Sequence, residues 1–598
     1  MSKLGTGALF PSKLQTFSAR PSTMFGLLPT AVSLAVGLLG ASVPVSAAPL
    51  AGPTVKLDSA TVTGTSLLGI DRFYGIPFAE PPTGNNRFRL PVPHPAYNTS
   101  FSATSMGPGC PQQEIDLPLP AGLPADVVDL LLNTVFTTIF PDDEDCLTIN
   151  VVRPAGTAPG AKLPVVAWIF GGGFELGSPQ MYDGGSIVSR SVALGEPVIY
   201  VSMNYRVTGE CSSPFTNAGR EMRALIVTQC LAFGFLASQE VKDAGVGNLG
   251  LQDQREALRW IQKYIGAFGG DPTKVTIWGE SAGAISVSLQ MLANGGNTEG
   301  LFRAGFMESG SPIPVGDITN GQKYYDAIVK QTGCSGSADT LQCLREVPYT
   351  QLKAAVDASP GIFSYQSLNL AWLPRTDGVF LTDHPQKLVQ QGKIAKIPIV
   401  SGDCDDEGTL FSLSTLNVTT EAQIRQYFQT EFLTTISTTG LDSILSAYPQ
   451  NLLAGSPYDT GILNALSPQF KRIASFQGDA VFQAPRRFFF ENILGGGNAN
   501  VWGFLSKRFK AVPILGSFHA SDILNVYGGG EMADYLINFT NNLDPNGKGK
   551  TITWPKYTTA SPTLLTFQDG LIPQTLSKDD FRADAMKQIT QVLLDNPV

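Results

Sequence analysis

One short segment, residues 275–283 with the sequence VTIWGESAG, restricts the possible folds of this chain more than any other. A β-branched and aromatic run leads into the pattern G-x-S-x-G, and a helix-forming stretch follows at residues 284–293. This context places Ser281 on a strained turn between a strand and a helix, where Gly279 and Gly283 leave room for the bend. The alternative, an ordinary glycine turn, does not account for the strand and helix on either side. The pattern predicts a nucleophilic serine at the edge of the sheet of an α/β protein.

Composition is consistent with one large folded domain. The chain has 598 residues, of which 43% are hydrophobic and only 15% charged, so a large core can form. The net charge of −9 argues against a nucleic-acid partner, because phosphate binding requires a basic surface. Internal repeats and long linkers are absent from the sequence, and we expect a single domain over residues 49–598.

The N-terminus has the pattern of a targeting segment. Three basic residues precede an apolar run at residues 25–39, and the small-residue segment VSAA ends at Ala48. The run is short and contains a proline and a glycine, which disfavours the alternative of a retained transmembrane anchor. We expect residues 1–48 to be a signal peptide or pre-region, and the mature protein to be secreted. Both Met1 and Met24 remain open as starts.

Three histidines are candidates for the base that must accept the proton of a nucleophilic serine. They are His94, His384 and His519. His519 follows the apolar run 512–515, and a loop after a late strand is where such a fold places its base. His94 lies between prolines, and His384 precedes a proline at an expected helix start. We expect His519 to be the base; the alternative is a structural histidine.

An acidic residue between Ser281 and His519 should orient the base. A buried-strand pattern at residues 397–400 ends just before an acidic cluster. The candidates are Asp403, Asp405, Asp406 and Glu407. Composition alone leaves all four open, and the alternative for such a cluster is a solvated acidic loop.

A glycine run offers donors for a developing oxyanion. Residues 165–170 form an apolar strand pattern, and the sequence GGGF follows at 171–174. Glycines let the backbone turn its amides toward a substrate oxygen. The alternative of a flexible hairpin is disfavoured directly after such a strand, and the spacing does not fit a dinucleotide-binding loop.

Several further segments together resemble the type-B carboxylesterase family, which includes cholinesterases and bile-salt-activated lipase. They are GIPFAEPP at 75–82, EDCLTINV at 144–151, NYRV at 204–207, NLGLQDQ at 248–254 and FGGDP at 268–272. Within that family, segments at 372–378, 402–409 and 554–557 resemble the large secreted lipases of fungi. The resemblance extends from about residue 50 to the C-terminus.

The resemblance implies an α/β-hydrolase fold, with a large, mostly parallel sheet flanked by helices. It implies Glu407 as the acid, which leaves Asp405 and Asp406 in a solvated loop. It also implies oxyanion donors from the amides of Gly172, Gly173 and Ala282, and a buried ion pair between Arg87 and Glu144. No metal or organic cofactor is implied.

The seven cysteines lack the spacing of a zinc site. The resemblance implies the disulfides Cys110–Cys146 and Cys334–Cys343. In the resembling lipases the segment at about 110–146 is a lid over an apolar tunnel. Its middle, residues 125–136, has an amphipathic helical pattern. That pattern alone fits a surface helix packed on the core equally well.

Residues 208–230 depart from the family pattern. Family members join NYRV to FGFL by a short spacer, whereas 25 residues separate Val207 from Phe233. The sequence at 209–211 can be encoded by a splice-donor consensus, and that at 228–229 by an acceptor consensus. We interpret the segment as a translated intron of roughly 69 nucleotides, or 23 codons. The alternative is a surface loop closed by a disulfide between Cys211 and Cys230.

The leading functional hypothesis is a secreted serine ester hydrolase that acts on long-chain acylglycerols, and on sterol esters, at a lipid–water interface. A carboxylesterase for short soluble esters and a non-catalytic adhesion or binding protein are the alternatives. We expect a monomer or weak dimer. Glycosylation sequons occur at Asn98, Asn417 and Asn538.

Overall fold

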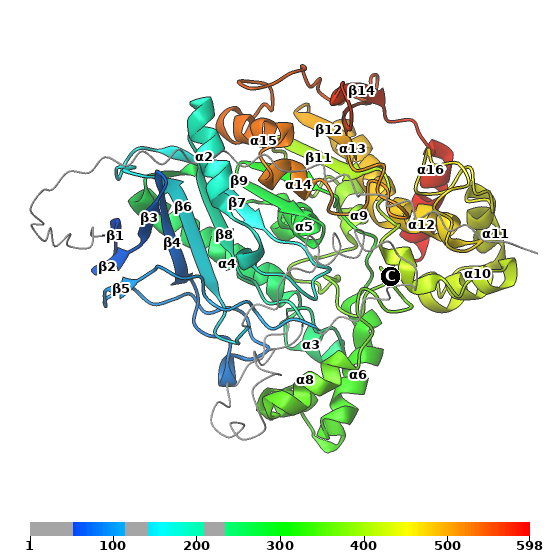
Figure 1. Ribbon diagram of the computed structural model, residues 1–598. Helices are drawn as coiled ribbons and strands as arrows, with labels where there is room; N and C mark the ends of the chain where they lie inside the picture. The colour runs from blue at the N-terminus through cyan, green and yellow to red at the C-terminus, as the bar shows by residue number, and fades with distance from the viewer. Residues whose placement is uncertain (1–51, 114–141, 209–233) are drawn as a thin grey trace, which may run out of the picture. The chain divides into compact units, whose positions relative to one another are not determined.

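The computed structural model of the protein describes residues 52–113, 142–208 and 234–598, whose core is an eleven-stranded sheet (Figure 1). Its strands are β3 (Thr65–Leu67), β4 (Ile70–Pro77), β6 (Thr148–Pro154), β7 (Leu163–Ile169), β8 (Ile199–Met203), β9 (Gly270–Glu280), β10 (Ala304–Glu308), β11 (Ile399–Cys404), β12 (Val501–Lys507), β13 (Thr563–Gln568) and β14 (Gln574–Lys578). They lie in the order β14-β13-β12-β11-β10-β9-β7-β8-β6-β4-β3. A separate small sheet contains β1 (Thr54–Leu57), β2 (Ala60–Thr63) and β5 (Phe101–Ser102).

The centre of the large sheet is parallel and its margins are antiparallel. Every neighbouring pair from β8 through β7, β9, β10, β11 and β12 to β13 is parallel. The central strands are buried along most of their length, which explains their continuous apolar sequences. The predicted α/β class and the mostly parallel sheet are confirmed.

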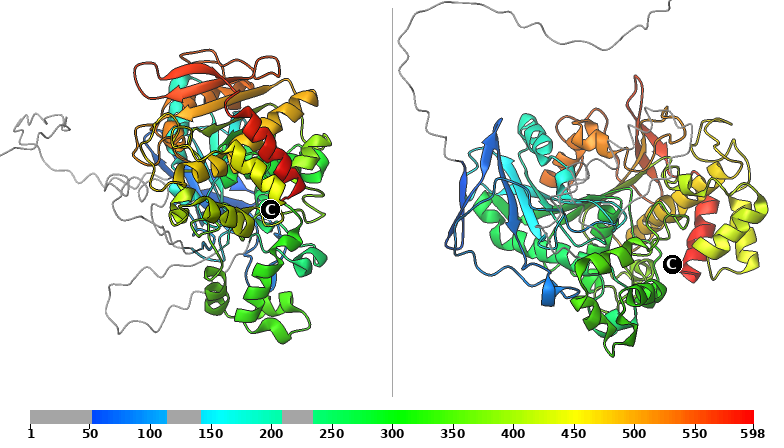
Figure 2. Two further views of the ribbon diagram at one scale, coloured as in Figure 1. Left: turned by 90° about the vertical axis from the view of Figure 1, so that its right-hand side faces the viewer. Right: turned by 60° about the horizontal axis from the view of Figure 1, so that its bottom comes forward.

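Helices cover both faces of this sheet (Figure 2). Their bounds are α2 (Gly184–Leu194), α3 (Gln239–Asp243), α4 (Leu249–Tyr264), α5 (Ala282–Gly296), α6 (Gln322–Gln331), α7 (Thr340–Glu346), α8 (Tyr349–Asp357), α9 (Pro385–Gln390), α10 (Glu421–Tyr427), α11 (Thr438–Ala447), α12 (Phe470–Gly478), α13 (Ala484–Gly495), α14 (Ile523–Tyr527), α15 (Glu531–Asn542) and α16 (Ala583–Asp595). Helices α2, α14 and α15 pack together on one face, and α4, α5 and α9 lie on the other. Among the helices described, none has both the length and the apolar character needed to cross a membrane.

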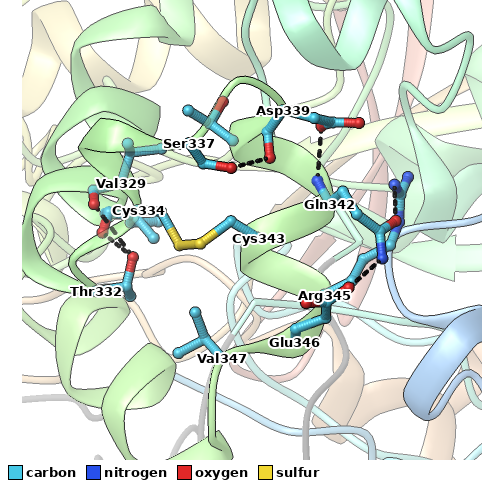
Figure 3. The surroundings of a disulfide bond; sticks show 12 residues. Val329, Thr332, Cys334, Ser337, Asp339, Gln342, Cys343, Arg345, Glu346 and Val347 are labelled. Atoms are coloured by element: carbon cyan, nitrogen blue, oxygen red, sulfur yellow. Dashed lines mark hydrogen bonds between the residues drawn. A yellow bond between two sulfur atoms is a disulfide. The ribbon is translucent and has the colours of Figure 1, made fainter.

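Two disulfides among the described residues connect loops outside the sheet. Cys110 is bonded to Cys146, and Cys334 to Cys343. Figure 3 shows the second pair, which links the turn after α6 to α7. Asp339 caps α7 by accepting a 2.8 Å hydrogen bond from the amide of Gln342, so the disulfide and the cap fix the same short helix.

Three sequence predictions fall outside the described residues. They concern the signal peptide at 1–48, the body of the lid segment at 114–141, and the insertion at 208–230, of which only Thr208 is described. They therefore stay predictions.

Candidate active site

Ser281 lies on a strained turn between β9 and α5. Its backbone has φ 54° and ψ −126°, in a region that a non-glycine residue rarely adopts. A Cβ on Gly279 would lie 2.4 Å from the carbonyl carbon of Gly283, and a Cβ on Gly283 would lie 2.0 Å from the carbonyl oxygen of Ile169. Both glycines are therefore needed for the helix to start this close to the sheet.

The structure brings Ser281, His519 and Glu407 together in one hydrogen-bonded chain. Ser281 Oγ lies 2.7 Å from His519 Nε2, and His519 Nδ1 lies 2.6 Å from Glu407 Oε2. With the ring proton on Nδ1, the imidazole donates to the carboxylate and can accept the serine proton on Nε2. The other histidines lie elsewhere: His94 stacks on Tyr97 and His384 caps α9.

The surroundings of the imidazole favour its neutral form. Burial lowers the pKa of His519 to about 4, although the negative charges of Asp522 and Asp403 oppose this shift. Burial also raises the pKa of Glu407 to about 8, while hydrogen bonds from the hydroxyl of Ser309 and the amide of Cys404 act in the opposite direction. A neutral ring can act as a base.

The glycine loop after β7 faces the serine. A Cβ on Gly171 would lie 2.7 Å from the carbonyl oxygen of Glu280 and 2.9 Å from the Cβ of Ser281, so the loop packs directly against the serine turn. Gly172 and Gly173 have φ of 115° and 64°, conformations that glycine adopts without strain. In the described part of the chain, the amides of Gly172, Gly173 and Ala282 donate no hydrogen bond to another protein group. The three amides remain available for an oxyanion.

Two apolar cavities meet at Ser281. The first is lined by Gly173, Ser281 and Ala282. Aliphatic and aromatic side chains form most of its remaining wall, among them Ile285, Leu370, Phe411, Phe432 and Leu593. The second is lined by Ser281, His519 and the glycine loop. Ser281 therefore lies between two largely apolar cavities.

The acidic loop differs from its expected solvated state. Asp405 and Asp406 are buried, at 5% and 0% exposure, and the Nζ of Lys510 lies 2.6 Å and 2.7 Å from their carboxylates. Asp403 is also buried and pairs with Arg486 at 2.7 Å. The prediction of a solvated loop was wrong, because cations from distant segments neutralise these carboxylates.

Two carboxylates near the base escaped the sequence reasoning. Glu280 Oε1 lies 3.4 Å from His519 Nε2, and Asp522 is fully buried three residues after His519. Burial and the charge of Asp522 raise the pKa of Glu280 well above its usual value. Glu280 was recognisable as the variable residue before the serine of the G-x-S-x-G pattern. Asp522 gave no comparable signal.

The remaining candidate residues have these positions. Arg87 Nε lies 3.1 Å from Glu144 Oε1, and both side chains are buried. Asn98 and Asn417 are exposed. Asn538 is fully buried in α15, where its side-chain amide bonds the backbone of Lys548 in both directions. Asn538 therefore has no room for a glycan in the folded chain, although the sequon suggested one.

A model of the carboxylesterase family matches residues 51–209 and 231–583. The chain belongs to the carboxylesterase family. The match is interrupted at residues 210–230, inside the segment that departs from the family pattern. The enzyme is thus a carboxylic ester hydrolase with an α/β-hydrolase fold.

Similar proteins of this family include secreted fungal lipases. Lipase 4 of Diutina rugosa is 43% identical, covering 89% of this chain and 94% of the relative. Secreted lipase 1 of Botryotinia fuckeliana is 41% identical, covering 90% and 93%. Secreted triacylglycerol lipase LIP1 of Gibberella zeae is 41% identical, covering 90% of both chains. The crystal structure of EstA from Aspergillus niger is similar with a TM-score of 0.74 at 27% identity, covering 91% of this chain and 99% of that one.

Proposed function

We propose that this carboxylesterase-family enzyme is a secreted lipase that hydrolyses long-chain acylglycerols through an acyl-enzyme. Ser281 Oγ attacks the ester carbonyl carbon while His519 Nε2 accepts the serine proton. The amides of Gly172, Gly173 and Ala282 bind the oxyanion. His519 then gives its proton to the leaving alcohol, and water attacks the acyl-enzyme by the same route. The observation that supports this most is the 2.7 Å and 2.6 Å chain from Ser281 through His519 to Glu407.

The apolar cavity beside Ser281 is an argument for esters of long acyl chains as the substrate. Burying each methylene contributes about 0.8 kcal/mol, so an apolar wall favours long over short chains. The sterol ester alternative fits the same apolar chemistry. The relative from Gibberella zeae is named a triacylglycerol lipase, and those from Botryotinia and Gibberella are named secreted, which supports the substrate class and the export of residues 49–598.

The test compares hydrolysis of emulsified long-chain acylglycerols, sterol esters and dissolved short-chain esters by the wild type and Ser281→Ala. We expect long-chain acylglycerols to be preferred and Ser281→Ala to be inactive. A preference for short soluble esters would favour the carboxylesterase alternative. A failure of organophosphates to label Ser281 would favour the non-catalytic alternative.

The predicted lid would begin beside the glycine loop at 171–174, which we call the oxyanion loop for the role proposed above. The amide of Gln113, the last described residue before the gap, donates a 2.8 Å hydrogen bond to the carbonyl of Glu175. Cys110 and Cys146 join the two ends of the predicted lid segment. This placement supports the proposal that the segment covers the site. A comparison of rates below and above the solubility limit of an ester substrate, where an interface first forms, would test it.

The residues that flank the predicted insertion are joined by a backbone hydrogen bond. The amide of Gly234 donates to the carbonyl of Val207 at 3.0 Å. If the 23 residues 208–230 were absent, this bond would close an ordinary turn in which residue i accepts from residue i+4. The fold on both sides would therefore tolerate their removal, which supports the intron interpretation over a required loop.

A further inference from the structure

We propose that Asp406 is a positioning residue for this reaction, because it fixes the loop that carries Glu407 to the loop that carries His519. The inference rests on the proposed catalytic roles of those two residues. We call residues 403–409 the acid loop and residues 512–519 the base loop.

The two loops need a connection because neither catalytic side chain lies on a regular element. Glu407 follows the end of β11 at Cys404, and His519 comes well after the end of β12 at Lys507. A displacement of ~1 Å between catalytic groups can cost about 100-fold in rate. The 2.6 Å contact between His519 and Glu407 must therefore be maintained by contacts outside the pair.

Asp406 makes two hydrogen bonds to the backbone of Ser517 in the base loop, one through its own amide and one through its carboxylate. Its amide donates to the carbonyl of Ser517 at 3.0 Å, and the amide of Ser517 donates to Asp406 Oδ2 at 2.9 Å. Asp406 and Phe518 form an isolated parallel bridge. Since these residues directly precede Glu407 and His519, the bridge places the two catalytic side chains opposite each other.

The carboxylate of Asp406 is itself held by two further segments. Its Oδ1 accepts from the amide of Tyr458 at 2.7 Å and from Ser456 Oγ at 3.0 Å, and Lys510 Nζ lies 2.7 Å from Oδ2. A Cβ on Gly516 would lie 2.3 Å from Oδ2, so the base loop has a glycine where this carboxylate packs. Because the carboxylate is fully buried and accepts from four donors, its side chain is held in a single orientation.

Thr409 provides a second connection between the same loops. Its Oγ1 lies 2.7 Å from the carbonyl of Leu515 and 2.9 Å from that of Asp406, and it can donate to either. Positions 515, 517 and 519 of the base loop are thus held by residues 409, 406 and 407.

The test compares Asp406→Asn with Asp405→Asn. Both aspartates are buried and bind Lys510, but Asp405 has its other cationic contact with Lys507. Asparagine at position 406 has one acceptor oxygen where aspartate has two, and its NH₂ group would face one of the donors that the carboxylate binds. We expect Asp406→Asn to lower kcat by about 10- to 100-fold with little change in KM, because only the geometry of proton transfer changes. Asp405→Asn should keep kcat close to the wild type.

Two further measurements separate positioning from loss of folded protein. Active-site titration with an organophosphate corrects kcat for the competent fraction. The far-downfield proton resonance of the His519–Glu407 hydrogen bond should shift or broaden in Asp406→Asn and stay in place in Asp405→Asn. Thr409→Val, which keeps the shape of the side chain but removes the hydroxyl, should also lower the corrected kcat, as Asp406→Asn does.

The inference would be overturned if Asp406→Asn and Asp405→Asn had equal corrected kcat values and identical downfield spectra. Its failure differs from that of the proposed function. If Glu407→Gln abolished turnover while Asp406→Asn did not affect it, only the positioning role would fail. If Glu407→Gln left turnover intact, the proposed triad itself would fail.

Discussion

Gly172→Ala is the sharpest test of the oxyanion loop. Gly172 has φ 115°, and a Cβ there would lie 2.4 Å from the carbonyl oxygen of Leu176 and 2.9 Å from its carbonyl carbon. These backbone atoms cannot rotate away, because the amides of Glu175 and Leu176 donate to the carbonyl of Gly172 at 3.1 Å and 3.0 Å. The loop itself must move, and its amides must leave the position opposite Ser281.

The expected effect on catalysis exceeds the effect on stability. A residue forced into such a backbone region costs of order 1–3 kcal/mol. Losing one oxyanion donor costs ~3 kcal/mol in the transition state, or about 10²- to 10³-fold in kcat. Gly245→Ala is the matched control: Gly245 has φ 65° and nothing within 4 Å of an added Cβ, so it tests backbone strain away from the serine.

The assay measures kcat and KM on a soluble p-nitrophenyl ester, together with thermal unfolding of both variants. We expect both variants to lose some stability and only Gly172→Ala to lose kcat. If both are folded and have equal kcat, Gly172 does not supply a donor and the loop has another role.

Three other predictions concern the triad and the insertion at 208–230. Glu407→Gln should lower kcat by about 10⁴-fold, because an amide stabilises the imidazolium poorly and favours the wrong tautomer; unchanged labelling of Ser281 by an organophosphate would contradict this. Since burial lowers the pKa of His519 to about 4, the base stays unprotonated as the pH falls, and kcat/KM should decline only well below the ordinary histidine value of 6.5; a midpoint above 6.5 in an enzyme that remains folded would refute it. Complementary DNA from the transcript should lack 23 codons between those of Val207 and Gly234; a product that retains them would establish the segment as coding.

The strained turn at Ser281 could be predicted because its geometry is local. The strand, the bend and the helix occupy one continuous segment, and the two glycines are required by contacts within a few residues of Ser281 and with the neighbouring strand. The glycine loop after β7 is local in the same sense. His519 was identifiable for a different reason, namely that only three histidines exist and only one follows a late apolar run. That run, residues 512–515, forms a bend and a turn in the structure, and the strand before it is β12.

The acidic loop could not be predicted because its environment is assembled from distant sequence. Lys510 is 104 residues from Asp406, and Arg486 is 83 residues from Asp403. A run of four carboxylates resembles a solvated surface until those cations are placed against it. Asn538 shows the same limit, since a three-residue sequon says nothing of the helix packing that buries its side chain.

The site is a consequence of sheet order as much as of its residues. The oxyanion loop follows β7, Ser281 follows β9, Glu407 follows β11 and the base loop follows β12, and all four strands are parallel members of one run in the sheet. The carboxyl ends of parallel strands lie at the same edge of the sheet. His519 therefore lies close to Glu407 and Ser281, although they are 112 and 238 residues away in the sequence. The sheet order brings the loops close together, but it does not set the distances between the side chains to within about 1 Å. We propose that the contacts between the two loops, above all the hydrogen bonds between Asp406 and Ser517, fix those distances.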